Sequence, residues 1–352
     1  MNSSSHSRIA LIDVALAAVL ARLDLRSLYG QRVFITGGTG FFGLWLLSAL
    51  RLLHSQGLRF EACVLSRDPA VFLGRHPQFA GVPWLRFIQG NVRDLEPVHG
   101  PFHLLLHAAT ETSLAAHADA VGMFDDIVMG TRRVLALAER SGVRRALLIS
   151  SGAVYGPQPS DVLHQSEDSA MACSTLLPGS AYGEGKRVME WLGAVCSQRT
   201  GIEVVTARCY AFSGAGLPLD GHFAIGNFVR DALFHEDITV QGDGSPIRSY
   251  LDGADLAVWL LGLLLYGQTG QAYHVGSDEA LSIHELALRV RDLLAPGKAV
   301  RLMREPDPAA SVRPCYVPSI SRARALGCAP WTDLDESLRR MAAYGSRLAN
   351  GE

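Results

Sequence analysis

Short apolar runs alternate with longer segments of helical periodicity over the first two thirds of the chain. The apolar, β-branched runs predict strands at 32–36, 61–65, 85–88, 102–107, 146–150 and 204–208. The segments between them predict helices at 44–53, near 121–141 and at 181–199, and an amphipathic helix at 9–20 precedes the first strand. Because parallel neighbours need crossover connections, this alternation predicts an α/β fold, a doubly wound parallel sheet of the Rossmann type.

Beyond residue 210 the alternation loosens into loops that contain glycine and proline. Short helices are predicted there at 224–233, 254–265 and 282–294, and a late strand at 273–276. We therefore expect a smaller C-terminal α/β substrate-binding domain that interleaves with the sheet. The expected division is a helical extension at 1–29, a dinucleotide-binding domain at 30–209 with return segments near 246–276, and a substrate domain at 210–245 and 277–352.

The charge balance and the cysteines exclude several classes of protein. Lys and Arg number 32 against 34 Asp and Glu, a net charge of −2, so no global positive field attracts nucleic acid or a membrane surface. The 6 cysteines lack CxxC or CxxH spacing, and the histidines show no ligand spacing, so we expect no metal site, no disulfide framework and a cytoplasmic location. The apolar segment 9–20 contains Asp13, is too short for a membrane span and lacks a basic leader.

A glycine cluster follows the first predicted strand. Gly37, Gly40 and Gly43 stand directly between that strand and the helix at 44–53. Such a turn lets the backbone approach a pyrophosphate, and the free N–H groups at the start of the helix attract its negative charge. Because it is flanked by a strand and a helix, the cluster predicts a dinucleotide-binding site.

The end of the second strand leaves the choice between NAD and NADP open. An acidic residue there accepts a hydrogen bond from the adenosine ribose of NAD, but this chain has Ser66 followed by Arg67. Arg67 could neutralise a 2′-phosphate, which favours NADP, or could pair with Asp68 at the surface. Asn91, after the third strand, can accept a hydrogen bond from the adenine amino group.

Tyr182 and Lys186 are the main catalytic candidates. They lie four positions apart on a predicted helix, so both side chains project from one face. The lysine cation, together with the positive charge of an oxidised nicotinamide, would lower the pKa of the phenol and suit it to take a proton from a sugar hydroxyl. Upstream, Ser151 belongs to Ser150-Ser151-Gly-Ala-Val-Tyr155-Gly156, which ends the fifth strand at the edge where open α/β sheets bind ligands.

Together these motifs resemble the extended short-chain dehydrogenase/reductase family. The resemblance covers nearly everything after residue 30, and it includes the glycine turn, His107-Ala-Ala109 and Gly242-Asp-Gly-Ser-Pro-Ile-Arg248-Ser-Tyr250. Similar members are nucleotide-sugar epimerases, dehydratases, decarboxylases and ketoreductases. The resemblance implies that Ser151 orients the reacting hydroxyl, that Tyr182 is the acid/base and that Lys186 holds the cofactor ribose.

The resemblance also implies binding residues and an assembly. Those expected at the cofactor are Gly37, Gly40, Phe41, Phe42, Gly43, Ser66, Arg67, Asn91, Val92, Ala108, Ala109, Thr110, Tyr182, Lys186 and Tyr210. Those expected at a nucleoside-diphosphate sugar are Glu111, Ser151, Asn227, Arg248 and Arg313. The two arginines suit phosphate oxygens, whereas a helix cap is the alternative role for Asn227. A homodimer is implied, formed through helices near 115–140 and 181–200.

Departures from the family pattern bear on the reaction. Dehydratases and decarboxylases of the family carry a carboxylate just before Val-Tyr-Gly, where this chain has Gly152 and Ala153, and Ala211 stands where many relatives have an asparagine. Without that carboxylate the chemistry reduces to oxidation and reduction at C4 of the sugar, although Glu111 could supply a substitute. By contrast, Tyr-Gly-Glu-Gly-Lys-Arg and Ala-Ile-Gly-Asn-Phe look most similar to UDP-glucuronate decarboxylases.

The simplest reaction that these residues predict is 4-epimerisation of a nucleoside-diphosphate sugar with NAD or NADP. A 4,6-dehydratase or a UDP-glucuronate decarboxylase-like lyase stays open, and Arg67 keeps an NADPH-dependent 4-ketoreductase open. A non-catalytic module that senses the cofactor is the alternative outside enzymes, because a fold alone does not guarantee catalysis. The presence of Ser151, Tyr182 and Lys186 together favours an enzyme.

Overall fold

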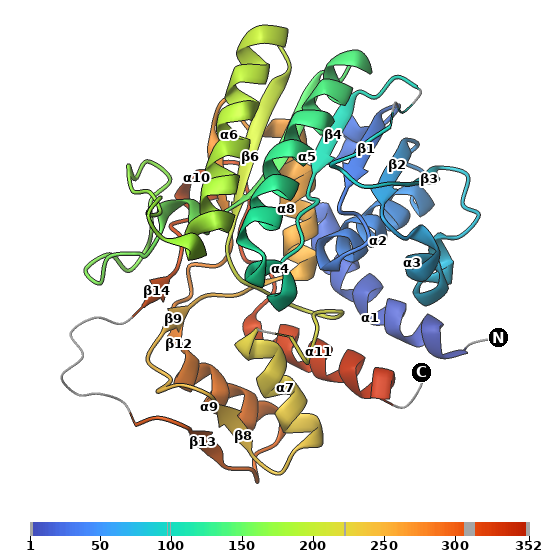
Figure 1. Cartoon of the computed structure of the whole chain (residues 1–352). Helices are drawn as coiled ribbons and strands as arrows, with labels where there is room; N and C mark the ends of the chain where they lie inside the picture. Colours follow the sequence, from blue (N-terminus) through green and yellow to red (C-terminus); the bar gives the residue numbers. More distant parts are fainter. Residues whose placement is uncertain (1–2, 97, 99, 222, 306–313, 350–352) are drawn as a thin grey trace.

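A seven-stranded parallel sheet forms the centre of the molecule in the computed structural model, which describes residues 3–96, 98, 100–221, 223–305 and 314–349 (Figure 1). The strands are β1 (Arg32–Thr36), β2 (Glu61–Ser66), β3 (Leu85–Gln89), β4 (Leu104–His107), β5 (Arg145–Ser151), β6 (Glu203–Cys209) and β11 (Ala272–Val275). Their order is β11-β6-β5-β4-β1-β2-β3, and each neighbouring pair is parallel. The winding reverses between β1 and β4, as in a Rossmann sheet, so the predicted fold class is confirmed.

Helices cover both faces of this sheet, which explains why its strands appear in the sequence as continuous apolar runs. On one face α1 (Ser3–Val19), α2 (Phe41–Ser55) and α8 (Gly253–Tyr266) share a core with Val33 and Ile35. On the other face α5 (Ala120–Arg140) and α6 (Ala181–Thr200) pack together over Phe34. Successive β1 side chains therefore enter opposite cores, as the alternation along a strand requires.

The N-terminal helix belongs to the main core and begins earlier than the pattern predicted. α1 begins at Ser3 instead of residue 9, and it buries Ile12 and Leu16 where it packs against α2 and α8. Val14 faces away from this core and is exposed. The segment therefore acts as a packed cover for the sheet helices.

A smaller α/β part lies below the sheet in Figure 1. Its core combines α7 (Ala224–Phe234), α9 (Ile283–Leu294) and α11 (Leu334–Ala349) with the parallel pair β8 (Ile238–Val240) and β13 (Val300–Leu302). The strands and helices of the whole molecule not yet named are β12 (Leu281–Ser282), β9 (Ile247–Arg248), β14 (Cys315–Tyr316), β10 (Leu251–Asp252), β7 (Phe212–Ser213), α3 (Pro69–Arg75), α4 (Leu114–Ala118) and α10 (Ser321–Ala325). The chain enters this part after β6, returns to the sheet through α8 and β11, and leaves again.

Local signals set several helix ends. α9 begins with a capping box, in which the Ser282 hydroxyl accepts from the Glu285 N–H and the Glu285 carboxylate accepts from the Ser282 N–H. α3 begins at Pro69, where the Asp68 side chain caps the helix by accepting from the Val71 N–H at 3.0 Å. These caps fix where the loops before α9 and α3 end.

Candidate active site

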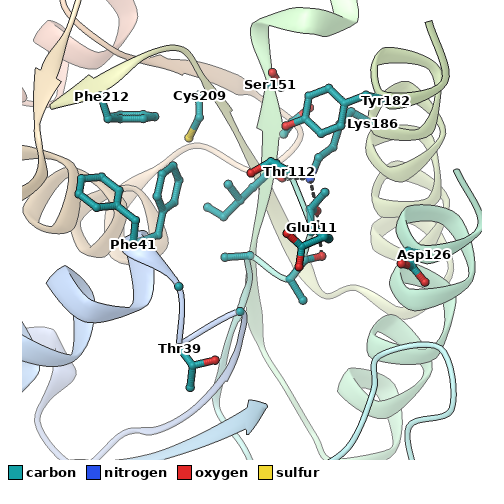
Figure 2. A pocket seen from close by; sticks show the side chains of 18 of the residues that line it. Thr39, Phe41, Glu111, Thr112, Asp126, Ser151, Tyr182, Lys186, Cys209 and Phe212 are labelled. Atoms are coloured by element: carbon teal, nitrogen blue, oxygen red, sulfur yellow. Dashed lines mark hydrogen bonds between the residues drawn. The ribbon is translucent and has the colours of Figure 1, made fainter. Parts of the chain in front are cut away.

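A cavity of about 630 Å³ lies where the carboxyl ends of the central strands face the smaller part. Its walls come from segments far apart in the sequence: the glycine turn, the end of β2, the loops after β3 and β4, the first turns of α6 and the chain after β6. Figure 2 shows Ser151, Tyr182 and Lys186 on one side of it and Phe41 and Phe212 on the other. Open α/β sheets place their ligand sites at this edge.

The glycine turn between β1 and α2 forms one wall of the cavity. Gly37 has a φ of +73°, and a Cβ there would lie 2.5 Å from the carbonyl carbon of Ala108. A Cβ on Gly43 would lie 2.0 Å from the carbonyl carbon of Gly38, so α2 packs on its own turn only because residue 43 is glycine. Gly40 precedes α2 without a side-chain cap, which leaves the first N–H groups of the helix for an anion. The turn fits the pyrophosphate of a dinucleotide.

The predicted cofactor residues take two positions relative to this cavity. Gly43 lies behind the turn and does not line the cavity, so its role is in packing. The others do line it: Gly37, Gly40, Phe41, Phe42, Ser66, Arg67, Asn91, Val92, Ala108, Ala109, Thr110, Tyr182, Lys186 and Tyr210. The structure thus gathers these separate segments around one space, and their contacts with a cofactor stay predictions.

The end of β2 carries an ion pair that the sequence did not indicate. Arg67 Nη2 lies 2.6 Å from Glu111 Oε2, and both side chains remain partly exposed. Arg67 thus pairs with Glu111 and not, as the sequence alternative had it, with Asp68, whose Oδ1 caps α3. Arg67 thereby holds the pKa of the Glu111 carboxyl below its usual range. A carboxylate held ionised in an ion pair is a poor proton donor and a weakened base, so it does not suit the role of substitute acid/base group considered for Glu111.

The catalytic candidates meet at the end of β5. Lys186 is buried, and its Nζ donates to the Ile149 carbonyl at 2.7 Å and to Thr110 Oγ1 at 2.8 Å. The same nitrogen lies 5.8 Å from the centre of the Tyr182 ring. Ser151 Oγ accepts the Ala153 N–H at 3.2 Å and lines the same cavity. A phenol, an ammonium and a hydroxyl are therefore held within one small space.

Burial dominates the protonation of the phenol and of the lysine. It raises the pKa of Tyr182 to about 12, although a hydrogen bond from Ser151 acts in the opposite direction. Burial also lowers the pKa of Lys186 to about 8. The protein alone therefore does not bring the phenol near neutrality. The sequence prediction invoked Lys186 together with the positive charge of an oxidised nicotinamide, and that combined effect stays a prediction.

The predicted substrate residues are only partly brought together. Glu111, Ser151 and Arg248 line the cavity, and Arg248 Nη1 donates to the Ile247 carbonyl at 2.8 Å. Asn227 is not among the lining residues, and on α7 its Oδ1 accepts from Arg230 Nη1 at 3.3 Å. Arg313 lies outside the described residues. Contacts of these side chains with a substrate stay predictions.

Sequence reasoning missed other lining residues, among them Tyr316, Cys209, Phe212, His117, Asp126, Leu217 and Phe223. Cys209 could have been predicted from the sequence, because it ends β6 directly opposite Ser151 in the parallel register. Tyr316 had no local signal. It reaches Ser151 from β14, with the two hydroxyl oxygens 3.2 Å apart.

A comparison with family models identifies the chain. Residues 33–276 match the NAD dependent epimerase/dehydratase family. The chain belongs to this family. Membership confirms the resemblance found in the sequence and makes the protein an NAD-dependent enzyme. The preference for NADP suggested by Arg67 receives no support, since that guanidinium pairs with Glu111.

The curated relatives of this epimerase/dehydratase family member include UDP-glucuronic acid decarboxylases. The chain is 29% identical over 315 residues to UDP-glucuronic acid decarboxylase 6 of Arabidopsis thaliana, with 88% of each chain covered. It is 29% identical over 322 residues to UDP-glucuronic acid decarboxylase 1 of Danio rerio, covering 90% of this chain and 73% of that protein.

Solved structures share the fold at lower identity. The dTDP-glucose 4,6-dehydratase DesIV of Streptomyces venezuelae, solved with NAD bound, has a TM-score of 0.75 at 23% identity and covers 91% of this chain and 98% of its own. A UDP-glucuronic acid 4-epimerase of Bacillus cereus, in complex with UDP-glucuronic acid and NAD, has a TM-score of 0.75 at 19% identity. The match covers 90% of this chain and 99% of that chain.

In the described part of the chain, no cluster of three or more His, Cys, Asp or Glu side chains is arranged to hold a metal ion. Within the same residues, no helix combines the length and apolarity needed to cross a bilayer. Each of the cysteines at 63, 173, 196, 209, 315 and 328 is a buried free thiol.

Proposed function

We propose that this family member oxidises C4 of a nucleoside-diphosphate sugar and reduces the ketone again in the same cavity. The observation that carries the proposal is the convergence of Ser151, Tyr182 and Lys186 at the carboxyl end of β5, beside the glycine turn. Bound NAD supplies a hydride acceptor and a positive charge there. The names of the curated relatives support a nucleotide-sugar substrate.

In this proposal each side chain handles one atom or charge. Tyr182 takes the proton of the C4 hydroxyl, and Ser151 forms a hydrogen bond with the same oxygen. Lys186 stabilises the phenolate electrostatically and hydrogen-bonds a cofactor ribose. Arg248 binds the diphosphate, and Arg313 joins it as a second guanidinium. Asn227 gives up its hydrogen bond with Arg230 and binds the substrate instead.

We place UDP-glucuronate decarboxylation first among the finer reactions. Oxidation at C4 turns the uronic acid into a β-keto acid. The C5–C6 bond then breaks, carbon dioxide leaves, and the bonding electrons stay on the sugar as an enolate of the C4 ketone. C5 of this enolate takes a proton from water before C4 is reduced again. This step requires no base for the C5 proton, so the chemistry tolerates Gly152 and Ala153 in place of a carboxylate. A 4,6-dehydratase does require such a base, which makes dehydration the less suitable reaction for this site.

A 4-epimerase acting on a neutral hexose is the second candidate, and the cations of the cavity favour it. Among the described residues, Arg67, Lys186 and Arg248 are the Lys and Arg side chains that line the cavity. Arg67 pairs with Glu111, and Lys186 is engaged by Thr110 and Ile149. Of these three cations, Arg248 is the one that can bind a phosphate. No described cation of the cavity then remains for a sugar carboxylate.

One incubation separates these reactions. The protein, supplied with NAD and no reductant, is offered UDP-glucuronate, UDP-glucose or UDP-galactose, and products are identified by mass spectrometry and NMR. Carbon dioxide with a UDP-pentose supports decarboxylation, and a 4-epimer supports epimerisation. Stoichiometric consumption of NADPH on a 4-ketosugar would instead establish a ketoreductase. Binding of NAD without turnover of any nucleotide sugar would contradict the proposal and favour a sensing module.

We also propose the predicted homodimer through α5 and α6. Apolar side chains stand exposed on these two adjacent helices, namely Val121, Met129, Trp191 and Val195. Large apolar side chains left exposed on neighbouring helices are what an interface would cover. Sedimentation equilibrium should find a dimer for the wild type and a monomer for Trp191→Glu, and a monomeric wild type would contradict this assembly.

A further inference from the structure

A phenol from the smaller part of the molecule contacts the catalytic serine. Tyr316 ends β14, and its hydroxyl oxygen lies 3.2 Å from Ser151 Oγ. The same hydroxyl donates to the Cys209 carbonyl at 3.3 Å. Because a phenol carries one proton, that bond leaves the Tyr316 oxygen as an acceptor for the Ser151 hydroxyl.

The backbone after Tyr316 is clamped to the loop that follows β5. The Val317 N–H donates to Gln158 Oε1 at 3.1 Å, and the Val317 carbonyl accepts from the Gln165 N–H at 2.8 Å. The Ser319 N–H donates to the Gln165 carbonyl at 2.7 Å. Residue 316 is therefore fixed relative to the strand that carries Ser151.

The Tyr316 ring is also fixed within the cavity wall. Its centre lies 4.5 Å from that of the Tyr210 ring, and the Arg248 guanidinium lies 5.9 Å from it on β9, the strand that pairs with β14. A Cβ on residue 152 would lie 2.6 Å from a ring carbon of Tyr210 and 2.9 Å from the Tyr316 oxygen. The two tyrosines thus occupy the space next to Ser151 that a side chain at Gly152 would need.

We propose that Tyr316 is a positioning residue that acts through Ser151, an inference that rests on the proposed function. The Ser151 hydroxyl has one proton and two phenols to which it can donate: Tyr316, whose oxygen is 3.2 Å away, and Tyr182, whose pKa a hydrogen bond from Ser151 lowers. Donation to Tyr182 stabilises the phenolate, and donation to Tyr316 withdraws that stabilisation. Tyr316 therefore sets how strongly Ser151 favours the basic form of Tyr182, and it keeps the serine oriented between proton transfers.

The test is a titration of Tyr182 in the NAD-loaded protein, followed by tyrosinate absorbance. The signal of Tyr182 is the difference between each protein and its Tyr182→Phe counterpart. In Tyr316→Phe, which keeps the ring, Ser151 donates to Tyr182 alone, so the pKa of Tyr182 should fall by about 0.5 to 1 unit relative to the wild type, the range of one net hydrogen bond. The matched control is Tyr273→Phe, a buried phenol outside the cavity that accepts the Gln268 N–H, and it should leave the titration unchanged.

The serine dependence decides the outcome. In a Ser151→Ala background, Tyr316→Phe should no longer shift the titration of Tyr182. An unchanged or raised pKa of Tyr182 in Tyr316→Phe would overturn the proposal. So would a shift of the same size when Tyr316→Phe is combined with Ser151→Ala. Because no sugar is turned over, a negative result here is distinct from a failure of the proposed reaction.

Discussion

At the cofactor end of the cavity, one continuous segment from β1 to α2 supplies Gly37, Gly40 and Phe41, whereas the substrate end takes Tyr182, Arg248 and Tyr316 from three separate segments. The first end is defined largely by local geometry, since Gly37 and Gly43 stand where a Cβ would collide with the backbone of Ala108 and of Gly38. The second end exists only after the smaller part has packed against the sheet. We therefore expect changes at the cofactor end to impair folding and NAD binding, and changes at the substrate end to impair turnover.

The largest effect should come from removing the phenol of Tyr182. Tyr182→Phe should lower kcat by about 10² to 10⁴-fold, the usual contribution of a general acid/base. NAD binding should stay within about twofold, because the phenyl ring remains in the wall. Isothermal titration with NAD and product assays measure the two quantities, and retained turnover would remove Tyr182 from the chemistry.

Lys186 should make folding stability depend on pH. Its pKa falls from 10.5 to about 8 on folding, so protonation favours the unfolded chain. Stability relative to Lys186→Met should be highest above about pH 10.5 and fall by about 3 kcal/mol as the pH drops to about 8, then level off. Urea unfolding of both proteins across this range measures the difference. A difference in unfolding free energy that does not change with pH would show that the pKa of Lys186 is the same in the folded and unfolded chain.

Two helical glycines offer a matched pair at the cofactor end. Gly43→Ala places a methyl group 2.0 Å from the Gly38 carbonyl carbon, so it should cost about 1–3 kcal/mol and weaken NAD binding. Gly74→Ala in α3 meets nothing within 4 Å and should be neutral or slightly stabilising. Thermal unfolding with and without NAD measures both, and equal effects would contradict the close approach of turn and helix.

The corresponding pair at the substrate end lies in two short 3₁₀ turns. Gly152→Ala must displace the hydroxyl end of Tyr210 or Tyr316, so kcat should fall roughly 10-fold or more, a larger loss than that of NAD affinity. Gly179→Ala has open space and should keep wild-type kcat. If Gly152→Ala lost NAD binding and turnover together, the two ends would not be separable as described.

The smallest effect should come from the exposed pair of Arg67 and Glu111. Glu111→Gln releases the guanidinium for a 2′-phosphate and should raise NADP affinity by about two- to fivefold, as expected for an exposed ion pair. NAD affinity should stay the same. Fluorescence titration with each dinucleotide measures the ratio, and a loss of NAD affinity would show that Glu111 contacts the cofactor region directly.

What the sequence predicted well is what neighbouring residues determine. The strand at 32–36, the glycine turn and the helix after it were recognisable because the pattern and the geometry belong to one segment. The spacing of Tyr182 and Lys186 placed both on one helix face for the same reason.

The rest depends on contacts between distant segments. The Arg67–Glu111 pair joins the end of β2 to the loop after β4, and Tyr316 crosses from β14 to β5, so neither has a local pattern. Burial raises the pKa of Tyr182 more than the hydrogen bond from Ser151 lowers it, and burial is a property of the assembled cavity. These are the features on which the choice of reaction depends.

The most direct test of C4 chemistry uses UDP-glucuronate and UDP-glucose deuterated at C4, with NAD and no other reductant. If oxidation and reduction occur at one carbon within one cavity, the product of whichever sugar reacts should retain the deuterium at C4, by mass spectrometry and NMR. In Tyr182→Phe the product should be nearly absent. A product that forms at the wild-type rate in this variant, or that has lost the deuterium from C4 to the solvent, would contradict the account.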